Sequence, residues 1–176
     1  NHSDSIRGLL PSRLDRGCLP RLAHLHRISC VLLCALSVTI IFSPSASIQT
    51  IGSYAFYGTA LTNVTLPPST QTVGSWAFFS TPLANIDFGS SLVSIADYAF
   101  YGARIEEASF PDSLIHIETQ AFRDVRSLSS ITFSASASIR YIGSRAFNGT
   151  ALTSVTLPFH TVYEPDAFPA DCVVLR

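Results

Sequence analysis

The sequence predicts a repeat solenoid of the α/β type, with coils of about 22 residues. Each coil is expected to contribute one short parallel β-strand followed by a turn or short helical segment. A phrase of seventeen residues, Ile51 to Pro67, returns at Ile142 to Pro158 with fourteen identities. Shorter versions lie between and after them, so that phenylalanine recurs at positions 56, 78, 100, 122, 147 and 168. A nearly fixed period in this range is typical of a solenoid.

The composition is consistent with a buried interior. Hydrophobic residues make up 47% of the 176-residue chain and charged residues 13%, which argues against disorder. The formal net charge of -1 gives no reason to expect a nucleic-acid partner.

Residues 1–39 are expected to form a separate, poorly ordered N-terminal segment. Five of the eleven arginines precede residue 30, and an apolar run follows from Ile28 to Phe42. This order is typical of a secretory signal or signal anchor, and a cap on the solenoid is the alternative. Fifteen residues of helix reach roughly 22 Å, short of a hydrocarbon core of roughly 30 Å. A signal therefore fits better than a spanning helix, although membrane association through residues 28–42 stays open.

The solenoid is expected to cover residues 40–176 in about five to six repeats. The stretch from residue 42 to 51 aligns without gaps with that from 133 to 142, which predicts a strand of a preceding repeat at the end of the apolar run. The chain ends at "CVVLR", where a further strand would begin, without a polar capping unit. Because solenoids need capped ends, we expect a truncated piece of a longer protein.

The strand of each repeat follows the phenylalanine by five or six residues. Its forms are "LTNVTLP", "LANIDFG", "IEEASFP", "LSSITFS" and "LTSVTLP", with apolar residues at positions 1, 4 and 6. Side chains alternate along a strand, so positions 4 and 6 point into the core while 3 and 5 point outward. A following proline or glycine ends the strand.

The "IGSxAF" half of each repeat predicts a turn followed by a short helical or irregular segment. Its alanine is expected at a tightly packed site, and its phenylalanine in the core. Gly52, Gly74 and Gly143 suit positions that need positive φ or close backbone approach.

The motif "LxxVxLPxSxxxIGxxAF" resembles the BspA-like leucine-rich repeat over about residues 42–168. The resemblance implies a secreted or cell-surface solenoid, several relatives being adhesins that bind host matrix proteins or promote aggregation. Two features depart from the pattern. Thr59, Thr81 and Thr150 stand where the family often has cysteine, and the asparagine ladder of other leucine-rich repeats is absent.

The outward strand positions 3 and 5 form the predicted ligand-binding surface. They would build a polar strip about 20–25 Å across five strands, slightly acidic in its middle, which suits a protein or glycan partner. The alternative is that these positions are simply solvated. The predicted residues are Asn63, Thr65, Asn85, Asp87, Glu107, Ser109, Ser130, Thr132, Ser154 and Thr156.

A second set of residues forms two aromatic columns at the repeat spacing. We expect these rings to pack on one another along the solenoid, the alternative being a binding stripe confined to the first three repeats. The columns consist of Tyr54, Trp76 and Tyr98, and of Tyr57, Phe79 and Tyr101.

Two triplets match the glycosylation sequon, at Asn63 and Asn148. A glycan on Asn63 would obstruct the predicted binding surface. No spacing of cysteine or histidine resembles a metal site, and no catalytic motif is present. We therefore expect no metal, no cofactor and no enzymatic activity. Glu106, Glu107 and Asp112 form a small acidic cluster that we expect to be solvated.

Three interpretations remain open at this level. The first is an extracellular or cell-surface recognition module in adhesion or host interaction, with a protein or glycan partner. The second is a structural spacer within a larger surface protein. The third is a cytoplasmic protein-interaction scaffold, in which the apolar N-terminal run is only a cap.

Overall fold

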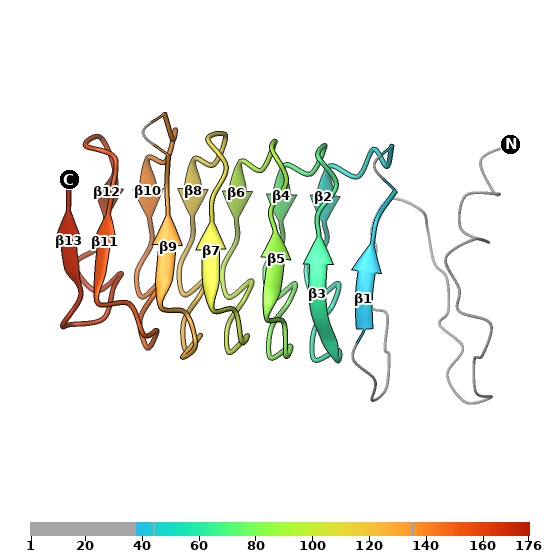
Figure 1. Ribbon diagram of the computed structural model, residues 1–176, viewed down its shortest axis with the longest axis horizontal. Helices are drawn as coiled ribbons and strands as arrows, with labels where there is room; N and C mark the ends of the chain where they lie inside the picture. The colour runs from blue at the N-terminus through green and yellow to red at the C-terminus, as the bar shows by residue number, and fades with distance from the viewer. Residues whose placement is uncertain (1–37, 44, 135) are drawn as a thin grey trace, which may run out of the picture.

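The computed structural model describes residues 38–43, 45–134 and 136–176, which form a solenoid with two rows of parallel strands (Figure 1). The odd-numbered row contains β1 (Val38–Ile41), β3 (Leu61–Thr65), β5 (Asn85–Asp87), β7 (Glu107–Ser109), β9 (Ser130–Thr132), β11 (Ser154–Thr156) and β13 (Val173–Leu175). The even-numbered row contains β2 (Thr50–Ile51), β4 (Thr72–Val73), β6 (Ser94–Ile95), β8 (His116–Ile117), β10 (Tyr141–Ile142) and β12 (Val162–Tyr163).

The prediction of one strand per coil was incomplete. A two-residue strand just before or within each "IG" pair adds a second ladder, a six-stranded sheet that runs from β2 to β12. The predicted strands form the odd-numbered row, whose hydrogen-bonded pairing falls into three groups: β1-β3-β5, β7-β9 and β11-β13. Two residues are too few for an alternating pattern, which explains why the second ladder was missed.

The expected α/β class and short helical segment are not confirmed, because the described residues contain no helix. In the segment after β2, backbone N–H groups alternate between two kinds of acceptor. Phe56 donates to Ala77 of the next coil at 2.7 Å, whereas Ala55 and Tyr57 donate to carbonyls three residues earlier. Helix formation would require every N–H to bond within its own segment. The bonds between coils therefore replace a helix by a ladder of turns.

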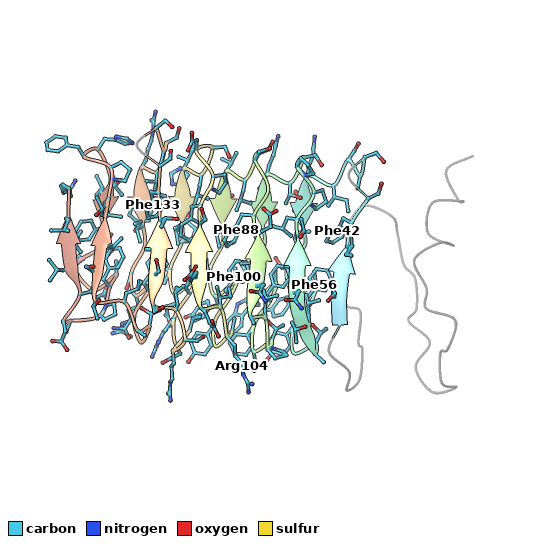
Figure 2. All side chains as sticks on the ribbon, viewed as in Figure 1. Phe42, Phe56, Phe88, Phe100, Arg104 and Phe133 are labelled. Atoms are coloured by element: carbon cyan, nitrogen blue, oxygen red, sulfur yellow. The ribbon has the colours of Figure 1, made fainter. Side chains whose placement is uncertain are left out.

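The core between the two rows is built from columns of identical residues. The six repeat phenylalanines lie in the core, as predicted, and they stack there with centroids 5.0, 5.1, 4.9, 5.2 and 5.3 Å apart. The alanine that precedes each of them is completely buried in all six coils. Figure 2 labels Phe56 and Phe100 of this column. It also labels Phe42, Phe88 and Phe133, which directly follow the strands β1, β5 and β9.

The threonines that stand where the family often has cysteine cap the turn. The hydroxyls of Thr59, Thr81 and Thr150 donate to the carbonyls of Phe56, Phe78 and Phe147 at 2.9, 2.8 and 2.7 Å. The backbone N–H groups of the same threonines donate to these carbonyls at 3.2, 3.4 and 3.3 Å, so each hydroxyl adds a second, shorter hydrogen bond that closes the turn.

Two expected roles of glycine are separated in the structure. A Cβ on Gly74 would lie 2.7 Å from the backbone nitrogen of Ser53, so close approach explains this position. Positive φ occurs two residues later instead, at Tyr54 (60°), Trp76 (61°) and Tyr98 (57°). Bulky residues rarely adopt this conformation. Gln120 (58°) and Arg145 (54°) adopt it at the equivalent positions without a ring, so the repeated turn and not ring stacking imposes it.

The expected signal, anchor or cap falls mainly on residues 1–37, outside the described part of the chain. The end of the apolar run forms β1, which pairs in parallel with β3, so the strand expected there is present. Within the described ranges there is no helix with the length and apolar character needed to cross a membrane.

Candidate recognition surface

The outward side of the odd-numbered row, called here the sheet face, carries all ten residues predicted to bind a ligand. Strand alternation buries the central side chains, such as Ala108 and Val155, and turns their neighbours outward. Asn63 and Ser130 are half-buried and the other eight are exposed. Their position on one face agrees with the alternation argument, while ligand binding by these residues stays a prediction.

Strand register aligns these side chains into columns. Asn63 stands opposite Asn85, and Thr65 opposite Asp87, because β3 and β5 pair in parallel without offset. In the same way Glu107 stands opposite Ser130. The polar surface ends at β13, whose Val173 and Leu175 are exposed opposite Ser154 and Thr156.

A groove of about 470 Å³ hollows the sheet face. It extends from β1 to β7 and crosses the place where pairing between β5 and β7 is interrupted. Its polar lining comprises Thr39, Asn63, Thr65, Asn85, Asp87, Glu106, Glu107 and Ser109.

The groove includes two residues that the sequence prediction did not assign to the site. Thr39 is the third-position residue of the preceding repeat, and extending the alignment of residues 42–51 backward would have found it. Glu106 was assigned to a solvated acidic cluster, and nothing in the strand pattern marks position 2 as part of a groove. Ser130, Thr132, Ser154 and Thr156 lie on the same sheet face but do not line the groove.

The asparagines of the groove form a short hydrogen-bonded ladder. The Asn85 amide Nδ2 donates to Asn63 Oδ1 at 2.7 Å, and Asn63 Nδ2 donates to Thr62 Oγ1 at 3.0 Å and Thr39 Oγ1 at 3.5 Å. Two neighbouring coils therefore share an asparagine contact on the sheet face, although the sequence lacks the ladder of other leucine-rich repeats. Because each donation fixes the amide orientation, Asn85 Oδ1 remains available as an acceptor.

Asp112 of the predicted acidic cluster is held by serines rather than placed in the groove. Ser134 Oγ and Ser136 Oγ both donate to its carboxylate, the latter at 2.6 Å. These two hydrogen bonds, that of Ser134 first, lower the pKa of Asp112 below its ordinary value. Asp112 thus serves the turn after β9, whereas Glu106 and Glu107 line the groove.

A titration tests this assignment. Because the folded-state pKa of Asp112 is depressed, its stabilising contribution is present above the unfolded value of about 3.9 and is lost as pH falls through the folded value. We expect Ser136→Ala to move the Asp112 midpoint upward, as followed by carboxyl-carbon NMR. Ser138→Ala, which removes an exposed hydroxyl nearby, should leave it unchanged. An unchanged midpoint in Ser136→Ala would contradict the hydrogen-bond assignment.

The two aromatic columns stack as expected, along one edge of the turns. Trp76 lies between Tyr54 and Tyr98 with centroids 6.1 and 4.3 Å apart, and Phe79 lies 5.0 Å from both Tyr57 and Tyr101. Tyr54 and Tyr57 are about half exposed at the N-terminal end of the columns. The ring faces mostly contact one another, so mainly ring edges remain accessible to a ligand.

Polar side chains continue these columns where the aromatic residues stop. Gln120 Nε2 donates to the Tyr98 hydroxyl at 2.8 Å, and the Arg123 guanidinium lies over the Tyr101 ring at 5.9 Å. A hydrogen bond to Asp124, with burial as a second cause, raises the pKa of Tyr101. The columns therefore extend into the fourth coil as a packing feature.

The two sequons occupy different settings. Asn63 lies inside β3, where its amide nitrogen, the atom that a glycan would modify, already donates hydrogen bonds. Asn148 is half-buried in a turn. Glycosylation of either residue stays a prediction.

Nothing in the described ranges gathers three or more histidine, cysteine, aspartate or glutamate side chains into a group that could hold a metal ion. The two histidines of the repeats lie apart, His116 in β8 and His160 in the turn before β12.

Comparisons with known proteins agree with this architecture. The family described as BspA type leucine rich repeat region matches residues 49–172 in six copies. No match was found among curated proteins. The solved structures include three relevant likenesses.

The crystal structure of the pneumococcal vaccine antigen PcpA is 27% identical, with a TM-score of 0.65 over 72% of this chain and 35% of that one. A leucine-rich repeat protein from T. pallidum is 25% identical, with a TM-score of 0.63 over 78% of this chain and 73% of that one. A leucine-rich repeat protein from Bacteroides ovatus, 22% identical with a TM-score of 0.60 over 65% of this chain, shows the fold alone. The chain spans about a third of the length of the pneumococcal protein and 30% of the Bacteroides protein.

Proposed function

The chain belongs to the BspA-type leucine-rich repeat family, and we propose that it is a non-enzymatic recognition module of a secreted or cell-surface protein. In this proposal it binds a protein or glycan partner through the sheet face and acts in adhesion or host interaction. Solenoids generally serve as extended recognition surfaces, and this one presents a continuous polar face.

One observation carries the proposal. Register between coils aligns outward polar side chains into columns, and in the first four strands of the odd-numbered row these columns surround the 470 Å³ groove. The columns follow from strand register, but a purely solvated face needs no hollow. The concave, hydrogen-bonding site therefore favours recognition over a structural spacer.

Similarity to other repeat proteins supports the surface location. The similar pneumococcal protein is described as a vaccine antigen, and the resemblance of the repeats to surface proteins points in the same direction. The two alternatives are a spacer within a larger surface protein and a cytoplasmic scaffold. Under either alternative, the sheet face would not bind an extracellular ligand.

Localisation and binding test the proposal together. The full reading frame with a C-terminal tag is expressed, and intact cells are probed with antibody and protease. The chain is then screened against arrays of matrix proteins and glycans. We expect surface exposure and binding that the double variant Thr65→Arg/Ser109→Arg weakens at least tenfold, because two long side chains fill the groove.

The matched control is Ser53→Arg/Ser90→Arg, which adds the same charge and bulk at exposed positions away from the groove. Equal losses in both double variants would show that the sheet face is not the binding surface. A protease-resistant tag inside the cell would favour the scaffold alternative.

A further inference from the structure

The groove crosses a place where the odd-numbered row is open. β5 and β7 lie in successive coils, yet no hydrogen-bonded pairing joins them, in contrast to β3 with β5 and β7 with β9. Backbone groups on the facing edges of β5 and β7 are therefore available to water or to a ligand. The hollow of about 470 Å³ lies within the range of ordinary ligand sites.

The side chains around this opening present hydrogen-bond acceptors. Asn85 uses its amide nitrogen on Asn63 and so offers Oδ1. Asp87 accepts from the Gly89 N–H through Oδ1 at 2.9 Å and retains Oδ2. Within the described ranges, no side-chain hydrogen bond or ion pair involves the carboxylates of Glu106 and Glu107. Among the residues that line the groove, the free side-chain donors are hydroxyl groups and the second amide N–H of Asn85, so acceptors predominate.

The charge of the groove has one sign. Three carboxylates line it and no basic side chain does. Arg104, from the same coil as β7, extends from the lower edge of the molecule, away from the strands (Figure 2). Arg123 and Arg145 lie beside Asp124 and Asp166 at 3.5 and 3.3 Å, on other parts of the described chain.

A donor-only cation complements this arrangement. The arginine guanidinium has five N–H donors in one plane and can pair bidentately with a carboxylate, whereas a lysine ammonium acts as a point charge. The floor of the groove includes half-buried Ile86, which offers some apolar contact to a methylene stem, whereas Val64 faces the core and is 3% exposed. We propose that the groove between β3 and β7 binds an arginine side chain of a protein partner. This rests on the proposed function of the sheet face.

A neutral glycan fits the groove less well. Sugar hydroxyls donate and accept in equal measure, and covering three carboxylates with a neutral ligand leaves their charge without compensation. Amino-acid side chains that carry a carboxylate are excluded by repulsion at the same place. The protein-partner branch of the proposed function is thus favoured over the glycan branch.

The test uses blocked pentapeptides as probes, Gly-Ser-Arg-Ser-Gly and the same peptide with citrulline, which keeps the shape of arginine but not its charge. Each is titrated to millimolar concentration into the isotope-labelled chain, and backbone amide shifts are followed by NMR. We expect the arginine peptide to shift amides of β3, β5 and β7, and the citrulline peptide to bind at least tenfold more weakly.

Two variants and two controls locate the contact. Asp87→Asn and Glu107→Gln each remove one groove charge at nearly constant shape and should weaken binding roughly tenfold. Asp97→Asn and Asp171→Asn remove the same charge at exposed positions outside the groove and should leave binding unchanged. Equal binding of the citrulline peptide, or equal weakening in all four variants, would overturn the inference.

Failure of this inference is separable from failure of the proposed function. If the arginine peptide does not bind, but Thr65→Arg/Ser109→Arg still abolishes capture of a partner from the arrays, the sheet face recognises a ligand of other chemistry. The arginine inference is then wrong and the proposed function stands. If the peptide binds in the groove, both receive support.

Discussion

Replacing Phe100 by alanine is expected to lower the free energy of unfolding by about 3–5 kcal/mol. Phe100 is completely buried and stacks between Phe78 and Phe122, with ring centroids 5.1 and 4.9 Å away. The Phe88 centroid lies 5.8 Å away in a T-shaped arrangement. Truncation removes the transfer free energy of the ring and leaves a cavity. Strands and turns on both sides hold the neighbouring coils in place, so the cavity cannot readily collapse.

The position of Phe100 within the stack adds to the effect. Each coil contacts only its neighbours, so a defect in a central coil weakens two interfaces and a defect in the last described coil weakens one. Within the described part of the column, Phe168 stacks on one phenylalanine, Phe147, at 5.3 Å, and Tyr163 meets it edge-on at 5.7 Å. Phe168→Ala is therefore expected to cost less than Phe100→Ala.

Urea unfolding followed by circular dichroism measures these differences. Phe159→Ala is the matched control, because this side chain is 86% exposed and should change the free energy of unfolding by less than about 0.5 kcal/mol. A loss of less than about 1 kcal/mol in Phe100→Ala would contradict the packing described for the column.

The sequence predicted those features of the fold that are marked by a repeating pattern of side chains. Phe56, Phe78 and Phe100 recur at a fixed period, which predicted their place in the core of successive coils. The alternation of Asn63, Val64 and Thr65 assigned one residue to the core and two to the surface, and the structure agrees. Both patterns arise because the same side chain faces the same environment in every coil.

What the sequence did not predict depends on the backbone. The bonds from Phe56 to Ala77 and from Tyr54 to Ser75 join peptide groups and leave no pattern of side chains. The sequence therefore left a helical and an irregular segment both open after the turn, and the helical one is not confirmed. Positive φ at Trp76 was hidden because glycine, which usually marks it, stands two residues earlier. Local turn geometry here is set by contacts between coils.

In the candidate site, too, side-chain patterns were predictable and features that depend on the backbone were not. Outward positions such as Asn85 and Asp87 were predictable from alternation. The groove was not, because it depends on the interrupted pairing between β5 and β7, and neither Glu107 nor its neighbours differ in residue type from solvated strand residues. Glu106 lines the groove from position 2, which alternation does not assign to the outward surface.

Replacing Ala99 by leucine is expected to lower the free energy of unfolding by about 3 kcal/mol, the upper end of the usual range for overpacking. Ala99 is completely buried, as are Ala77 and Ala121 in the coils on either side. Its carbonyl accepts from the N–H of Phe78 at 2.7 Å, and the next residue donates to Ala121. Additional carbon atoms at this site must push apart coils that these bonds hold at a fixed separation.

Ala151→Leu separates this effect from a general response to leucine, since Ala151 is exposed and has room for the larger side chain. We expect urea midpoints to fall in Ala99→Leu and to change little in Ala151→Leu. Equal midpoints in both variants would mean that the coils can separate at little cost. The alanine would then reflect turn formation rather than packing, and the bonds between coils would be weaker than their lengths imply.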